Sequence, residues 1–169
     1  MDSPHPGPLE SREESRGPQD MRILAATDGS AAATRAVELA ARLTCEFSGS
    51  LKIIHVVTES DASDDKMSEY AHSEHYGTAA EAATEFSEEK LRIAREKAEA
   101  LGASNVETAS VQELEAGAIA DTIIDAAHRA DATMIVMGKR GLSRLSGLIL
   151  GSVSQKVVSN ATCAVTVVP

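Results

Sequence analysis

The chain has 169 residues, of which 43% are hydrophobic and 2% aromatic, and its formal net charge is −10 at pH 7. This length predicts one domain with an aliphatic core, and no apolar run approaches the roughly 18 residues of a membrane span. The acidic balance argues against nucleic-acid binding by the general surface, because a polyanion would be repelled.

The N-terminal segment 1–20 is rich in Pro, Ser, Glu and Gly, and we expect it to form a disordered extension. It holds no apolar stretch of the kind found in secretory signals. The two cysteines, Cys45 and Cys163, have no metal-site spacing and are too few for a disulfide framework. These features favour a cytoplasmic location, where thiols stay reduced.

The first predicted elements are a strand, a helix and a second strand. The apolar run at 21–27 predicts a buried strand that ends in the turn sequence Asp-Gly-Ser. Apolar residues at helical spacing predict a helix over 30–46, with Ser30 or Asp28 as its cap. The run SLKIIHVV predicts a second buried strand at 50–57.

The middle of the chain is first acidic and then helical. Residues 59–77 are polar and acidic, and they predict a mobile loop. A helical stripe follows over 78–102 and ends at a glycine. We expect a third strand at 105–111 and a third helix at 116–129.

The last elements complete an alternation of strands and helices. A fourth strand is expected at 132–138, a helix at 151–160 and a fifth strand at 163–168. Strands that alternate with helices and are nearly continuous in apolar residues predict a parallel sheet covered on both faces. Right-handed crossovers then give a doubly wound α/β sheet, in which ligands sit outside the carboxyl ends of the strands.

Two segments that follow predicted strands suit such a ligand. One is the turn TDGS at 27–30, and the other is GKRGLSRLSGLILGS at 138–152. The second segment contains Lys139, Arg140 and Arg144 and no carboxylate, although the chain as a whole is acidic. This local excess of positive charge indicates a place where an anion is favoured.

The backbone of this basic segment also suits phosphate. A side chain at Gly138 would block close approach, and Gly141 permits a turn that other residues resist. Gly151 and Ser152 begin a helix, whose first N–H groups lack internal partners and attract an anion. The hydroxyls of Ser152 and Ser154 can add hydrogen bonds to phosphate oxygens. The sequence therefore predicts a phosphate-binding loop.

The glycine spacing is neither that of a Walker A loop nor that of the GxGxxG dinucleotide fingerprint. From Gly138 to Ser152 it is G-x2-G-x9-G-S, which resembles the signature of the ATP-binding universal stress proteins. The segments RILAATDGS, KIIHVV, ADATMIVMGKRG and GSVSQKVVSNATCAVTVVP are also similar to that family. The resemblance covers 21–169, which we expect to be one universal stress protein domain.

This resemblance implies an open five-stranded parallel sheet in the order 3-2-1-4-5 with helices on both faces, an adenine nucleotide alpha hydrolase-like fold. It also implies a homodimer through the last strand, 163–168, and ATP with Mg²⁺ bound between the loops after strands 1 and 4. The implied nucleotide-binding residues are Ala26, Thr27, Asp28, Val56, Met137, Gly138, Arg140, Gly141, Gly151, Ser152, Val153 and Ser154.

The resemblance also implies a role for several of these residues. Asp28 would meet the ribose or a magnesium-bridged phosphate, and backbone groups of Val56 would meet the adenine edge. Ala26 would lie against the base, where many relatives have a proline. Met137 and Gly138 would line the ribose and adenine side, and the last four residues of the set, with Gly141, would hold the phosphates.

Three functions stay open at this point. The first is a regulatory module that binds ATP, and the second is a slow ATPase or nucleotide-transferring enzyme that uses Asp28 and Mg²⁺. The third is an interaction dimer that binds no nucleotide. In that case Asp28 only caps a helix, the glycines only make turns, and Lys139 and Arg140 are ordinary solvated charges.

Overall fold

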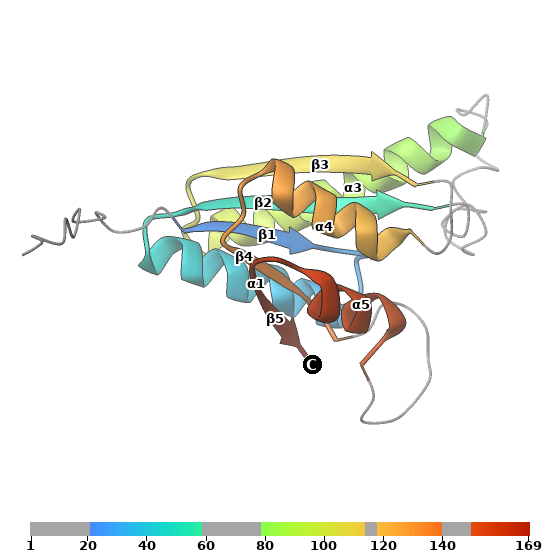
Figure 1. Cartoon of the computed structure of the whole chain (residues 1–169). Helices are drawn as coiled ribbons and strands as arrows, with labels where there is room; N and C mark the ends of the chain where they lie inside the picture. The colour runs from blue at the N-terminus through green and yellow to red at the C-terminus, as the bar shows by residue number, and fades with distance from the viewer. Residues whose placement is uncertain (1–20, 59–78, 114–117, 140–149) are drawn as a thin grey trace, which may run out of the picture.

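The computed structural model describes residues 21–58, 79–113, 118–139 and 150–169. Its strands are β1 (Arg22–Ala26), β2 (Ser50–Val57), β3 (Val106–Gln112), β4 (Met134–Gly138) and β5 (Ala164–Val168). Its helices are α1 (Ala31–Glu46), α3 (Ala79–Ala100), α4 (Ile119–Arg129) and α5 (Ser152–Asn160), as Figure 1 shows. The extension expected at 1–20 and the acidic loop expected at 59–77 lie outside the described residues.

The five strands form one parallel sheet in the order β3-β2-β1-β4-β5, which confirms the predicted fold class. β1 is central, and its last residue, Ala26, lies beside Ile54 of β2 and Met137 of β4. The chain winds outward from β1 to β3 and then returns to β4, so the winding reverses between β1 and β4. The carboxyl ends of all strands meet at one edge, on the right in Figure 1, where ligands bind in sheets of this kind.

Helices α1 and α3 cover one face of the sheet, and α4 and α5 cover the other (Figure 1). Successive side chains of a strand point to opposite faces. Ile23 and Ala25 therefore join the core under α1 and α3, whereas Leu24 joins the core under α4 and α5. The buried residues of the two cores are Ala, Val, Ile, Leu and one Met. In the part of the chain that the structure describes, no helix is long and apolar enough to cross a bilayer.

The element boundaries differ from the predicted ones where local turns intervene. The strand expected at 132–138 begins at Met134, because the amide of Ala132 still bonds to the carbonyl of Ala127 in α4 at 2.9 Å. Gly102 has φ +96° just beyond α3, and this left-handed turn ends the helix as expected. The helix expected at 116–129 begins at Ile119, directly after a gap in the described chain.

A buried polar chain lies in the layer between the sheet and α3. His55 of β2 is 1% exposed, and its Nδ1 lies 2.9 Å from the hydroxyl of Ser87 in α3. The Ser87 hydroxyl lies 2.8 Å from that of Ser110 in β3, and Lys90 Nζ lies 3.2 Å from His55 Nε2. An ammonium can only donate, so Nε2 is the acceptor and Nδ1 carries the proton toward Ser87. The chain thus connects two strands to the helix that covers them.

We expect Ser87→Ala to lower the free energy of unfolding by about 1–3 kcal/mol, because the Nδ1–H of buried His55 loses this hydrogen-bond partner. Urea unfolding measures the change. Ser110→Ala is the matched control: Ser110 is exposed, so water replaces its hydroxyl and the loss should stay within about 0.5 kcal/mol. Equal stability of Ser87→Ala and the parent would contradict the role assigned to this hydrogen bond.

Candidate functional site

The turn between β1 and α1 is fixed by its own side chains. The carboxylate oxygen Oδ1 of Asp28 accepts from the amide of Ser30 at 2.9 Å, and Thr27 Oγ1 accepts from the amide of Gly29 at 3.2 Å. Gly29 has φ +80°, a conformation that favours glycine. Ser30 is the N-cap of α1, and its hydroxyl accepts from the amide of Ala33 at 3.2 Å. Of the two predicted caps, Ser30 is therefore the one observed, and Asp28 orders the turn before it.

Gly138, at the end of β4, lies directly against the start of α1. A Cβ atom at this position would lie 2.9 Å from the amide nitrogen of Ala33 and 3.0 Å from the carbonyl carbon of Ala32. Such distances to backbone atoms are shorter than real Cβ contacts. Gly138 therefore allows β4 to pack closely against the backbone of α1, and its predicted role toward a ligand stays a prediction.

The backbone N–H and carbonyl of Lys139, the residue after β4, bond to two later elements. Its N–H donates to the carbonyl of Val168 in β5 at 2.6 Å. Its carbonyl accepts from the amide of Gly151 at 3.0 Å and from the hydroxyl of Ser154 at 2.7 Å. We call these three hydrogen bonds the Lys139 junction. The junction fixes the first residues of α5 beside the carboxyl end of β4.

The N-terminus of α5 presents backbone amides without a side-chain cap. Gly151 is the N-cap residue and provides no side-chain hydrogen bond, and the first helical bond runs from the amide of Gln155 to the Gly151 carbonyl at 2.9 Å. The amides of Ser152, Val153 and Ser154 therefore precede the helical hydrogen bonds. The first turn of α5 contains no acidic residue that would neutralise the positive end of its helix dipole, whereas the carboxylate of Asp28 lies at the start of α1.

Two details of the predicted phosphate loop differ in the structure. The amide of Gly151 donates to the Lys139 carbonyl in the Lys139 junction. It is therefore not available to bind a phosphate. Ser154 is 2% exposed and its hydroxyl donates to the Lys139 carbonyl, so this hydroxyl holds the loop rather than facing outward. Sequence reasoning missed both bonds, because the acceptor is a backbone carbonyl that no residue type marks.

Three of the other predicted residues gather on one face of the carboxyl edge. Ala26, Val56 and Met137 all pack with the core under α4 and α5, on three adjacent strands. Met137 is 5% exposed, whereas Ala26 and Val56 are half-buried. Thr27 is buried and Asp28 is half-buried in the turn that follows β1. The predicted residues Arg140 and Gly141 lie outside the described residues.

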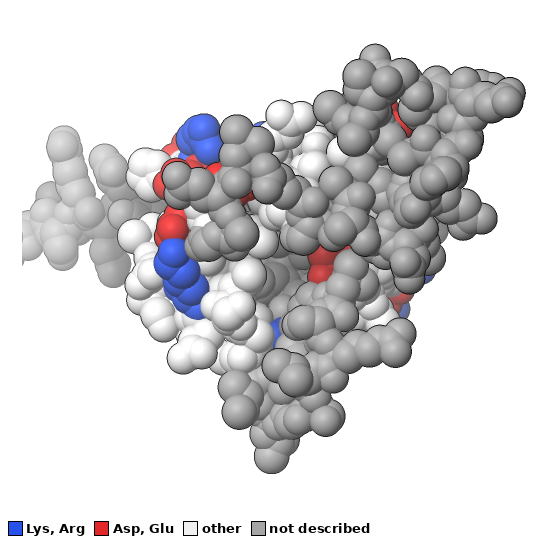
Figure 2. Space-filling model, turned by 90° about the vertical axis from the view of Figure 1, so that its right-hand side faces the viewer, with Lys and Arg blue, Asp and Glu red and all other residues white. Residues whose placement is uncertain are grey.

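Figure 2 looks onto this edge, where the described surface is mostly uncharged, with small separate patches of acidic and basic side chains. Within the described ranges, no three His, Cys, Asp or Glu residues are arranged to hold a metal ion. Asp28 is a single carboxylate, which suits Mg²⁺ only when other oxygens come from a phosphate ligand and from water. The edge thus offers uncapped amides, an apolar wall and the carboxylate of Asp28.

This chain is similar to known proteins in both sequence and fold. The model of the universal stress protein family matches residues 21–169. The universal stress protein YxiE of Bacillus subtilis is 30% identical over 148 residues, which are 87% of this chain and 97% of YxiE.

Two solved structures show the same fold. A universal stress protein in complex with cAMP has a TM-score of 0.62 at 24% identity and covers 88% of this chain and 95% of its own. The universal stress protein from Archaeoglobus fulgidus in complex with dAMP has a TM-score of 0.63 at 22% identity and covers 88% of this chain and 98% of its own. By its sequence match over residues 21–169 and its likeness to YxiE, the chain belongs to the universal stress protein family.

Proposed function

We propose that this protein binds an adenine nucleotide, ATP with Mg²⁺, at the carboxyl edge of its sheet and acts as a nucleotide-dependent regulatory module in the stress response. The observation that carries the proposal is the uncapped N-terminus of α5, which the Lys139 junction holds beside β4. The complexes of two structural relatives with cAMP and dAMP support an adenine nucleotide as the ligand class.

The phosphates bind to backbone groups in this proposal. The amides of Ser152, Val153 and Ser154 donate to phosphate oxygens, and the dipole of α5 adds a favourable field. Gly151 leaves the space in front of these amides open, because it has no side chain. Arg140 and Gly141 complete the phosphate site. Ser154 thus has two roles: its amide donates to the phosphate, and its buried hydroxyl donates to the Lys139 carbonyl.

The base and ribose lie against the strands. Ala26 and Met137, which are paired across β1 and β4, form the apolar wall together with Val56 of β2. Gly138 continues this wall without a side chain. Asp28 bonds to the ribose hydroxyls or to Mg²⁺ carried by the phosphates, and its hydrogen bond to the Ser30 amide holds the carboxylate at the start of α1. When bound, Mg²⁺ neutralises phosphate charge.

If the protein is a regulatory module, it should retain its bound nucleotide and hydrolyse little of it. We expect a purified sample, once denatured, to release an adenine nucleotide that mass spectrometry identifies. We also expect added ATP with Mg²⁺ to raise the melting temperature more than ADP, and ADP more than AMP, because a ligand of the folded state stabilises it and each phosphate adds contacts. Equal shifts from ATP and AMP would contradict the phosphate site.

Steady phosphate release would point instead to a slow ATPase. That alternative requires release to stop in Asp28→Ala while the nucleotide still binds. If neither a thermal shift nor a bound nucleotide is found, the interaction-dimer alternative gains support.

Gly151→Asp separates binding from folding. Gly151 has φ −63° and ψ 155°, which any residue adopts, and Asp is a favoured N-cap residue. We expect the stability without ligand to change by no more than about 1 kcal/mol, and ATP affinity to fall roughly 100-fold or more, because a carboxylate then faces the phosphates. Isothermal titration calorimetry measures the affinity.

Gly151→Asn is the matched control. Its side chain has the same size and can also cap the helix, but it carries no charge. We expect Asn to keep ATP affinity within about tenfold of the parent, since only local competition for an amide remains. Equal ATP affinities for the Asp and Asn variants would show that no phosphate lies at this helix start.

We propose also that β5 forms a homodimer with its copy, through residues 163–168. β5 is an edge strand that pairs only with β4, and four of its five side chains are half-buried. The Val168 carbonyl accepts from the amide of Lys139, the residue that follows β4. Alternate residues direct their backbone groups to opposite edges, so the amides of Val165 and Val167 point to the open edge. An apolar open edge of this kind is a place for strand pairing about a two-fold axis.

Val165→Pro tests this pairing. It removes an outward amide, and proline is tolerated on the open side of an edge strand. We expect light scattering at micromolar concentration to give a dimer for the parent and a monomer for Val165→Pro, with helix and strand content unchanged by circular dichroism. A monomeric parent, or a folded variant that stays dimeric, would contradict the proposed interface.

A further inference from the structure

A cavity of about 300 Å³ lies between α1 and α3, on the face of the sheet opposite Ala26 and Met137. It opens beside the turn that follows β1, whose residues Thr27 and Gly29 form one end. Its volume is at the lower end of the range for small-molecule sites. The side chains that shape it are Thr34, Val37, Phe86, Lys90, Ile93 and Lys97.

The floor of this cavity is apolar and its rim is cationic. Val37 and Phe86 are buried beneath it, whereas Ile93 is 42% exposed at its mouth. Lys90 and Lys97 stand on the same side of α3, two turns apart, because residues seven apart share a helix face. A Cβ atom at Gly29 would lie 3.5 Å from the aliphatic part of Lys90, and the Lys90 ammonium is 4.2 Å from the centre of the Phe86 ring.

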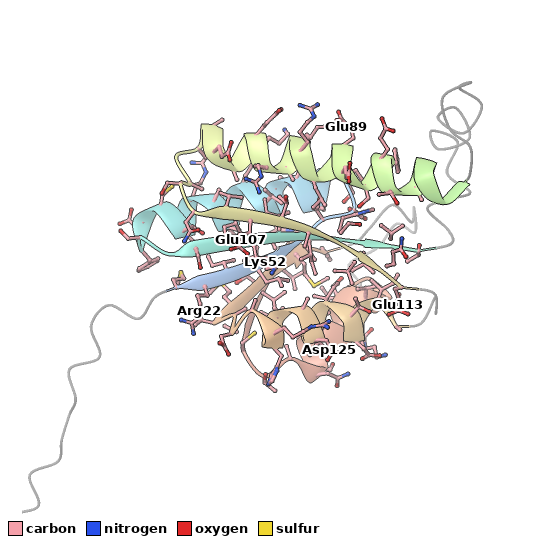
Figure 3. All side chains as sticks on the ribbon, turned by 90° about the horizontal axis from the view of Figure 1, so that it is seen from above. Arg22, Lys52, Glu89, Glu107, Glu113 and Asp125 are labelled. Atoms are coloured by element: carbon pink, nitrogen blue, oxygen red, sulfur yellow. The ribbon has the colours of Figure 1, made fainter. Side chains whose placement is uncertain are left out.

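The carboxylate that lines the cavity, that of Glu89, is bound by Arg92, whose guanidinium also bonds to Glu96. Both oxygens of Glu89 accept from the guanidinium of Arg92, each at 2.7 Å. These hydrogen bonds hold the pKa of Glu89 below its ordinary value, so the group is ionised and committed to Arg92. Figure 3 shows Glu89 on the side of α3 away from the sheet. Lys97, in contrast, makes no ion pair with any residue of the described chain.

We propose that this cavity is a second ligand site, which takes a small amphiphilic carboxylate. The apolar body of the ligand lies on Val37 and Phe86, and its carboxylate meets the ammonium of Lys97 at the rim. Lys90 contributes its aliphatic part and its positive charge at the inner end. A neutral molecule of the same shape loses the charged contact, and a cation is repelled by the lysines.

This site shares Thr27 with the set of predicted nucleotide-binding residues, and its other lining residues lie outside that set. Thr27 lies on the same face of β1 as Ile23 and Ala25, toward α1 and α3. Ala26 lies on the opposite face, toward α4 and α5. The two ligands would therefore sit on opposite sides of the sheet, with the short turn after β1 between them.

Octanoate is the probe that tests this proposal, with 1-octanol as a neutral molecule and octylamine as a cation of equal chain length. Two-dimensional ¹H–¹⁵N NMR follows the backbone amides during each titration. We expect octanoate to shift the amides around Thr34 and Lys97, and octanol and octylamine to bind at least about tenfold more weakly. Binding should weaken as salt rises, because the charged contact lies at an exposed rim.

Lys97→Gln removes the charge at the rim and should weaken octanoate binding about tenfold. Arg42→Gln is the matched control, since Arg42 is an exposed cation on α1 that does not line the cavity. It makes the same change in net charge and should leave binding unchanged. Thr34→Leu narrows the cavity while it keeps both lysines, and should also weaken binding, with the melting temperature as the control for folding.

Three results would overturn the proposal. They are octanoate-induced amide shifts that map elsewhere on the protein, equal affinities for octanoate and octanol, and an equal loss of octanoate affinity in Lys97→Gln and Arg42→Gln. The Gly151→Asp variant should bind octanoate like the parent. Loss of ATP binding with octanoate binding intact would then separate the two sites.

Discussion

The backbone of Lys139 joins the three elements on which the carboxyl edge depends. Lys139 directly follows β4, its N–H bonds to the last residue of β5, and its carbonyl bonds to the start of α5. A helix N-terminus binds an anion where its free amides point at the ligand. The Lys139 junction fixes the direction in which the first amides of α5 point. The bonds use backbone atoms of residue 139, so its long basic side chain is not needed to make them.

The same alternation that builds a parallel sheet also separates the two proposed sites. Along β1, neighbouring side chains enter different cores, and the division continues into the turn. Ala26 faces α4 and α5, and Thr27 faces the cavity beside α3. Asp28 then fixes the turn by a hydrogen bond to the Ser30 amide, and the Ser30 hydroxyl joins the turn to the Ala33 amide of α1.

Much of the fold could be predicted because its signals are local. Nearly continuous apolar strands indicated a sheet buried on both faces, and the left-handed Gly102 ended α3 where glycine was expected. The order of the strands came only from a resemblance to a family, since apolar periodicity says nothing about which strands are neighbours. The position of the basic glycine loop at the carboxyl edge followed from the chain order of the elements.

The internal use of the Ser154 hydroxyl could not be predicted in this way. It depends on a carbonyl fifteen residues away that comes near only when the sheet forms. The His55 chain and the cavity depend likewise on contacts between α3 and the sheet.

The strand order has a consequence for how the chain is made. β1 is complete near the start of synthesis, but its pairing with β4 joins residues that are 111 positions apart at Arg22 and Thr133. At ribosomal speeds of about 5–20 residues per second, one edge of β1 waits roughly 5–20 s for its neighbour. During that interval β1, β2 and β3 present an apolar sheet with an unpaired edge. The nascent protein is therefore most exposed to aggregation before β4 emerges, and a chaperone that acts on it would act in that interval.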